Sequence, residues 1–119
     1  MRNICKTPQA EKQYKRIFKE TARRFGKAVA METMRQLDEA EHNLATETAF
    51  VRRDTDHRSD RFEFVTIKNS QTIFFERIGD DIVIVAAGWS GRNWKERLEE
   101  MQPYIDQQIN KLHKLKSHQ

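Results

Sequence analysis

The stretch 73-IFFERIGDDIVIVAAGWSGRNW-94 contains two apolar runs joined by a short polar turn. The first run belongs to a strand predicted over residues 72–78, and Gly79-Asp80 is a turn signal. The second run is predicted as a strand over residues 81–87, and it is almost entirely apolar, which is typical of a strand buried on both faces. Because the connection is so short, the two strands are predicted to pair antiparallel.

A third strand is predicted directly upstream, over residues 61–68, followed by an Asn-Ser turn. Its side chains alternate in part, so that Phe62 and Phe64 lie on one face, and Val65 and Ile67 on the other. The three strands are therefore predicted to form an antiparallel meander.

Two amphipathic helices are predicted before the strands. Thr7 is a typical N-cap residue and Pro8 a typical first helical residue. Gly26 can take the left-handed conformation that ends a helix, and a second helix follows over residues 27–44, which together make a helical hairpin. The apolar face of the first helix is predicted to contain Ala10, Tyr14, Ile17, Phe18, Ala22 and Phe25. That of the second is predicted to contain Ala30, Met31, Met34, Leu37, Ala40 and Leu44.

The two ends of the chain complete the predicted order. Residues 1–6 are predicted as an N-terminal edge strand. A C-terminal helix is predicted from the apolar stripe Trp94, Leu98, Met101, Ile105, Ile109 and Leu112, with Pro103 kinking it or starting a new helix. Residues 1–112 are expected to form a single domain and residues 113–119 a basic tail. Segregated helices and an antiparallel sheet indicate the α+β class.

The composition limits the classes of function. The 119 residues, 37% hydrophobic and 34% charged, suffice for one domain with one core. The net charge of +4 suits nucleic acid or an acidic partner and identifies neither. Cys5 is the only cysteine, which excludes an internal disulfide and a thiolate metal cluster. No stretch approaches the roughly 20 apolar residues needed to cross a membrane. We therefore expect a soluble, cytoplasmic protein with no membrane partner, no cofactor and no metal.

The charged region 45–60 has no clear period, and 51-VRRDTDHRSDR-61 is predicted to be an exposed loop. An alternative is that its arginines bind an acidic partner. The interleaved aspartates cancel much of the field of these arginines, which favours the solvated loop.

Three stretches carry a resemblance to a known family. The stretch 7-TPQAEKQYKRIFKETARRFG-26 has a Thr-Pro-x-Ala start and a Phe-Gly end, 73-IFFERIGDDIVIV-85 has an arginine before a short turn and an apolar strand, and 90-SGRNW-94 has a Gly-Arg and a tryptophan. In this order they resemble the RelE/ParE superfamily of bacterial type II toxins. The last stretch is similar to the His-Gly-Arg-Arg-Asp-Trp ending of the ParE-like branch. The resemblance covers about residues 1–98.

This resemblance implies a small toxin that is neutralised by a cognate antitoxin protein encoded with it. The antitoxin would lie on the domain as a helix or an added strand. ParE-like members are associated with poisoning DNA gyrase, whereas RelE-like members cut messenger RNA on the ribosome. The resemblance also implies that the last strand passes through the middle of the sheet and that its end opens onto the target surface.

The residues expected to contact the target are Arg61, Arg77, Trp89, Arg92 and Lys95. Gly88 and Gly91 let the backbone bend sharply and expose the residues between them. Arg77 matches the family's hairpin arginine and is expected to approach the same surface as Arg92. The structural alternative for Arg77 is an ordinary surface charge, paired across the sheet or with Asp80.

Trp94 is interpreted differently from Trp89. It begins an apolar helical stripe, which favours a core anchor over a platform for stacking a base. Trp89, between a glycine and Ser90, is the stronger candidate for an interface contact, because tryptophan is enriched among the residues that dominate interface energies.

An RNase would need a base, an acid and cations around the scissile phosphate. Arginines would supply the cations, and Lys68 or Lys95 remain for proton transfer. No histidine or tyrosine lies near the end of the last strand, where Ser90 takes the place of the family's histidine, and Glu76 replaces the aromatic before the hairpin arginine. The catalytic residues are left unassigned, and poisoning by binding is favoured over RNA cleavage. A non-toxic nucleic-acid-binding or adaptor module is the remaining alternative.

Overall fold

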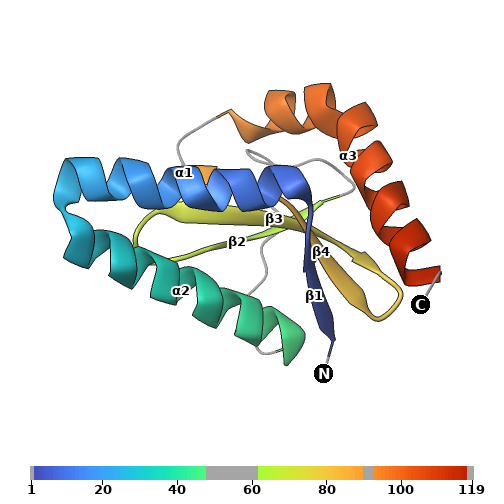
Figure 1. The fold of residues 1–119 in the computed structure, drawn as a ribbon, viewed down its shortest axis with the longest axis horizontal. Helices are drawn as coiled ribbons and strands as arrows, with labels where there is room; N and C mark the ends of the chain where they lie inside the picture. Colours follow the sequence, from blue (N-terminus) through green and yellow to red (C-terminus); the bar gives the residue numbers. More distant parts are fainter. Residues whose placement is uncertain (1, 48–61, 90–92, 118–119) are drawn as a thin grey trace.

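The computed structural model describes residues 2–47, 62–89 and 93–117, except for the side chains of Lys95 and residues 113–117. Within these ranges the chain forms a four-stranded mixed sheet and three helices (Figure 1). The elements in chain order are β1 (Asn3–Lys6), α1 (Pro8–Phe25), α2 (Lys27–Ala45), β2 (Glu63–Thr66), β3 (Gln71–Ile78), β4 (Asp81–Trp89) and α3 (Trp94–Ser117). This order confirms the predicted α+β class.

The strand order in the sheet is β1-β4-β3-β2. The pairs β2–β3 and β3–β4 are antiparallel, as predicted for the meander, with Phe64 opposite Phe74. The N-terminal strand is at the edge, as predicted, and it pairs with β4 in parallel, with Ile4 opposite Ile82. As a result β4 lies between two neighbours. Its sequence is apolar on both faces because the helical hairpin covers one face of the strand and α3 covers the other.

The helical hairpin forms because of two local signals. The Thr7 Oγ1 accepts a hydrogen bond from the Ala10 amide at 3.1 Å and caps α1. At the other end Gly26 has φ 93° and ψ 164°, and its amide donates to the Ala22 carbonyl at 3.0 Å. This φ lies in the region that favours glycine, although the residue does not take the left-handed helical conformation predicted from the sequence.

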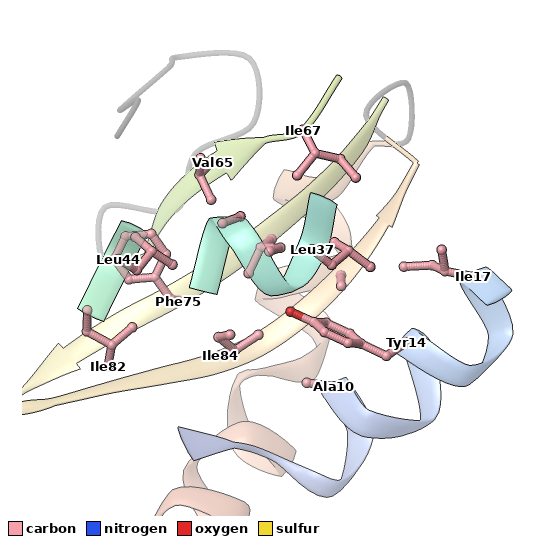
Figure 2. Close-up of a cluster of buried hydrophobic side chains, with 13 residues drawn as sticks. Ala10, Tyr14, Ile17, Leu37, Leu44, Val65, Ile67, Phe75, Ile82 and Ile84 are labelled. Atoms are coloured by element: carbon pink, nitrogen blue, oxygen red, sulfur yellow. The ribbon is translucent and has the colours of Figure 1, made fainter. Parts of the chain in front are cut away.

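Each face of the sheet has its own core. On one face, α1 and α2 pack on the sheet around Leu37 and Phe75, and we call this the hairpin-side core (Figure 2). On the other face, α3 packs around Phe74 and Trp94, and we call this the α3-side core. The faces of β2 are as predicted, since Val65 and Ile67 belong to the hairpin-side core, and Phe62 and Phe64 to the α3-side core.

Two details of the helices differ from the sequence prediction. Met31, expected on the apolar face of α2, is 58% exposed, because the buried stripe of the helix runs through Ala30, Thr33, Leu37, Ala40 and Leu44. No second helix begins at Pro103, since α3 continues through it and reaches Ser117, beyond the predicted end at residue 112. The helix changes direction along its length, in agreement with the predicted kink (Figure 1).

Candidate functional site

A bulge in the β3–β4 pairing decides which face of the sheet Trp89 occupies. Phe74 pairs with Ala86 and Phe75 pairs with Ile84, so Val85 is an extra residue on β4. Ile84 faces the hairpin-side core and, after the bulge, so does Ala87, three residues further on. By alternation Trp89, two residues after Ala87, lies on the same side as the helical hairpin.

Trp89 lines a groove between the end of the sheet and the end of the helical hairpin. The groove has a volume of 330 Å³, and its lining comes from α1, α2, the β2–β3 turn and the end of β4. We call it the Trp89 groove, and it is lined by Thr21, Phe25, Val29, Thr33, Lys68, Asn69, Ser70 and Trp89. Trp89 and Lys68 are the lining residues that the sequence indicated as functional candidates, and each was indicated separately. For Phe25, the sequence signal was the apolar stripe of the first helix, which continues to this residue at the end of the helix.

Trp89 is half-buried, and both its side chain and its backbone make contacts. The guanidinium carbon of Arg24 lies 6.0 Å from the centroid of the indole ring, within the range of a cation–π contact. The backbone carbonyl of Trp89 accepts a hydrogen bond from Trp94 Nε1 at 2.9 Å. The orientation of Trp89 therefore depends on α1 and on the start of α3.

Part of the groove is apolar and exposed. Phe25 is 58% exposed and Val29 is 40% exposed, and both line the groove. Phe25 continues the apolar stripe of α1, yet it is not covered by the sheet as Tyr14 and Ile17 are. Among the described residues, the other large hydrophobic side chains with comparable exposure are Met31 and Tyr104.

Some polar side chains in and beside the groove are hydrogen-bonded, and others are not. Asn69 is fixed, because its side-chain amide donates to Thr33 Oγ1 at 2.9 Å and its backbone amide donates to Gln36 Oε1 at 3.0 Å. Thr21, which is 3% exposed, has a buried Oγ1 with no hydrogen-bond partner. The buried side-chain amide of Gln71, the residue opposite Trp89 in the sheet, likewise has no hydrogen-bond partner.

The rim of the groove is basic. Lys68 is exposed, and the carboxylate of Glu32 is near enough to be influenced by its charge. Glu32 is already engaged by Arg35, whose guanidinium donates to it at 2.6 Å and 2.8 Å. The hydrogen bonds from Arg35, with a further one from Gln36, lower the pKa of Glu32 to about 2. Lys68 is the charged side chain in the described lining of the groove.

A second groove lies along α1. It has a volume of 560 Å³ and is lined by Lys6, Glu11, Tyr14, Lys15, Phe18, Lys19 and Met34, and we call it the α1 groove. The ammonium group of Lys6 pairs with Glu41 at 3.3 Å and lies 4.8 Å from the centroid of the Tyr14 ring. Burial of Tyr14 raises its pKa, and the Glu41 carboxylate raises it further. The groove thus combines apolar side chains with lysines, and it adjoins the edge strand β1.

Arg77 does not lie with Trp89. Arg77 is opposite Ile82, whereas Trp89 is opposite Gln71. Arg77 and Gln71 are six positions apart on β3, so Arg77 lies about 20 Å from Trp89 along the strand. The expectation that Arg77 approaches the same surface as Arg92 stays a prediction, because Arg92 lies outside the described residues. The Arg77 Nε lies 3.4 Å from a carboxylate oxygen of Glu63 on the neighbouring strand. With 37% of its side chain exposed, Arg77 is a surface charge paired across the sheet, as in the structural alternative.

Trp94 is part of the core. It is 1% exposed, and its ring centroid lies 4.8 Å from that of Phe74. Gly88 makes room for it, because a Cβ atom added at Gly88 would lie 2.7 Å from Trp94 Cζ2. The interpretation of Trp94 as a core anchor is confirmed.

The other candidate residues cannot be placed. Arg61 and Arg92 lie outside the described residues, as does most of the charged loop predicted over residues 45–60. Lys95 is in the first turn of α3, and its side chain is not described. In residues 2–47, 62–89 and 93–117, no group of three or more His, Cys, Asp or Glu side chains could hold a metal ion. No helix in these ranges has the length and apolar character needed to cross a membrane.

Comparison with known proteins supports the fold. No family model matches the chain, and no curated protein matches it. Among solved structures, the chain is similar to a chain of "Chromosomal ParDE TA system from P. aeruginosa", with a TM-score of 0.60 and 16% identity, over 75% of this chain and 96% of that one. It also matches the conserved hypothetical protein HP0894 from Helicobacter pylori, with 14% identity over 75% of this chain and 94% of that one. The TM-score of that match is 0.44. The first of these matches shows that this chain shares the fold of that chain from a ParDE system.

Proposed function

We propose that this chain is the toxin of a type II toxin–antitoxin pair and that it arrests growth by binding an essential target. The observation that carries the proposal is the match to almost the whole of a chain from a ParDE toxin–antitoxin system, at 96% coverage of that chain. The sequence signatures at both ends of α1 and in the β3–β4 hairpin agree with this assignment. Such a toxin would act in the cytoplasm, with DNA gyrase as the target if the chain is ParE-like.

Binding is favoured over RNA cleavage by the side chains around Trp89. A 2′-hydroxyl attack needs a general base and a general acid on opposite sides of the phosphate. In the described lining of the Trp89 groove, Lys68 is the titratable side chain, and the lining contributes neither a carboxylate nor an imidazole. One lysine does not supply both roles, and this supports a toxin that binds its target without cutting it.

The α1 groove is the proposed binding site of the antitoxin. It places the apolar side chains Tyr14, Phe18 and Met34 beside the edge strand β1. An amphipathic helix buries its apolar face in such a groove, and an extended segment pairs with a free strand edge. An antitoxin segment on this side would cover both features at once.

The test is expression of the chain alone from an inducible promoter, with growth, DNA supercoiling and translation followed together. We expect growth arrest that is reversed by co-expression of the neighbouring open reading frame, with supercoiling affected before translation. Normal growth without the neighbour would refute the toxin proposal. Early cleavage of messenger RNA would instead favour the RelE-like endoribonuclease. Normal growth together with nucleic-acid affinity that falls steeply with salt would indicate the non-toxic binding module.

A further inference from the structure

The geometry of the Trp89 groove points to an acidic segment of the target protein as its occupant. We propose that one large apolar side chain of that segment lies between Phe25, Val29 and Trp89, and that flanking carboxylates pair with Arg24 and Lys68. This inference rests on the proposed function, because it names the surface through which the toxin would hold its target.

The apolar part of the groove is larger than the fold requires. Phe25 and Val29 remain 58% and 40% exposed, and Trp89 is half-buried beside them. Exposed aromatic and aliphatic side chains around a groove are typical of protein interaction sites, and tryptophan is prominent among residues that dominate binding energy. A volume of 330 Å³ is at the lower end of the range for binding pockets, which suits a single inserted side chain.

The polar lining of the groove also calls for a partner. Buried hydroxyl groups in proteins almost always make a hydrogen bond, and leaving one without a partner costs free energy. Thr21 lines the groove with a buried Oγ1 that has no such partner. A backbone amide or carbonyl of an inserted peptide would satisfy it, since a hydroxyl both donates and accepts.

The charge around the groove selects an acidic segment. The Arg24 guanidinium lies 6.0 Å from the centroid of the Trp89 ring, and Lys68 lies on the rim with Glu32 already bound to Arg35. The last turn of α1 adds a second arginine, Arg23, beside Arg24. Complementary charge of this kind speeds association and rejects partners of the wrong sign.

A protein segment fits these features better than nucleic acid does. Interfaces with nucleic acid are more polar than those between proteins, and they are dominated by contacts to phosphate. The exposed side chains of Val29 and Phe25 can neither donate a hydrogen bond to a phosphate nor pair with its charge. The target is favoured over the antitoxin because Trp89 directly precedes residues 90–92, where the sequence predicts target contact, and because the α1 groove is lined by different residues.

The experiment compares matched pairs of variants in growing cells, at equal protein level. Phe25→Ala is paired with Met31→Ala, since both side chains are 58% exposed and Met31 does not line the groove. Lys68→Glu is paired with Lys111→Glu, an equal charge change on the exposed surface of α3. Folding is checked by circular dichroism, and antitoxin binding by co-purification with the product of the neighbouring reading frame. Affinity for a 12-nucleotide oligouridine is measured for each purified protein.

We expect Phe25→Ala and Lys68→Glu to reduce the loss of viable cells at least tenfold, while they stay folded and still bind the antitoxin. Met31→Ala and Lys111→Glu should behave as wild type. Full toxicity of both groove variants would overturn the inference. A groove variant that stays toxic but no longer binds the antitoxin would also overturn it, because the groove would then be an antitoxin site. A loss of oligouridine affinity in parallel with toxicity would assign the groove to RNA and would also overturn it. Absence of toxicity in the wild type refutes the proposed function itself, and this inference with it, before any variant is considered.

Discussion

Replacing Gly88 with alanine tests how Trp94 is held against the sheet. The added Cβ atom would lie 2.7 Å from Trp94 Cζ2 and 3.0 Å from Cη2, well inside the normal carbon–carbon separation of about 3.5–4.0 Å. Both atoms belong to a rigid ring that is 1% exposed and packed against Phe74, so Trp94 cannot move aside freely. Overpacking of this kind costs about 1–3 kcal/mol, and we expect Gly88→Ala to lower the free energy of unfolding by that amount.

A double-mutant cycle with Trp94→Phe assigns the cost to this contact. Phenylalanine lacks the Cζ2 and Cη2 atoms that the new methyl group would meet. Trp94→Phe has its own cost, because it removes packing volume and the hydrogen bond from Nε1 to the Trp89 carbonyl. In the Trp94→Phe background, however, Gly88→Ala should cost less than it does alone, by about 0.5 kcal/mol or more.

The assay is urea unfolding of the four proteins followed by far-ultraviolet circular dichroism, which does not depend on the tryptophan that is removed. Equal m-values across the four proteins are the control, because they show that the mutations change stability and not the surface exposed on unfolding. If the two mutations are additive within about 0.3 kcal/mol, the cost does not arise from the contact between Gly88 and Trp94. An unchanged stability of Gly88→Ala alone would likewise refute the predicted overpacking.

Three further predictions concern other parts of the chain. Arg92→Ala is expected to fold normally and to lose growth arrest. Trp94→Ala should instead lose about 3 kcal/mol or more of stability, because Trp94 is buried. Equal toxicity of wild type and Arg92→Ala at equal protein level would remove Arg92 from the site. Gly26→Ala meets no atom within 4 Å, so its cost in urea unfolding should be backbone strain alone, about 1–3 kcal/mol at φ 93°, and an unchanged midpoint would contradict this. Arg35→Ala should raise the pKa of Glu32 from about 2 toward its ordinary 4.5 in a carboxyl titration by NMR. Because that pKa is lowered in the folded state, the pair stabilises the fold above pH 4.5, and this contribution is lost as the pH falls toward 2. A Glu32 titration that the mutation leaves unchanged would show that Arg35 does not cause the lowered pKa.

The sequence by itself determined the local elements and their faces. Thr7-Pro8 and Gly26 set the ends of α1, and Gly79-Asp80 set the turn between β3 and β4. Side chains that alternate along β2 reached the two cores that the sequence assigned to them. These features were predictable because each depends on neighbours within a few residues: a cap, a turn or a period.

Tertiary structure decided how those elements meet, and thereby the candidate site. The extra residue at Val85 puts Trp89 on the hairpin side, and no alternation rule applied to an all-apolar strand could reveal that change of face. Arg77 lies just before the turn that precedes β4, and Trp89 lies at the far end of β4. The antiparallel register therefore separates the two residues by almost the length of β3. Phe25 continues a buried stripe and is nevertheless exposed, because the sheet does not reach the end of the helical hairpin that carries it. A groove that joins two helices, a turn and a strand end depends on contacts between residues far apart in the chain, and local patterns carry no information about such contacts.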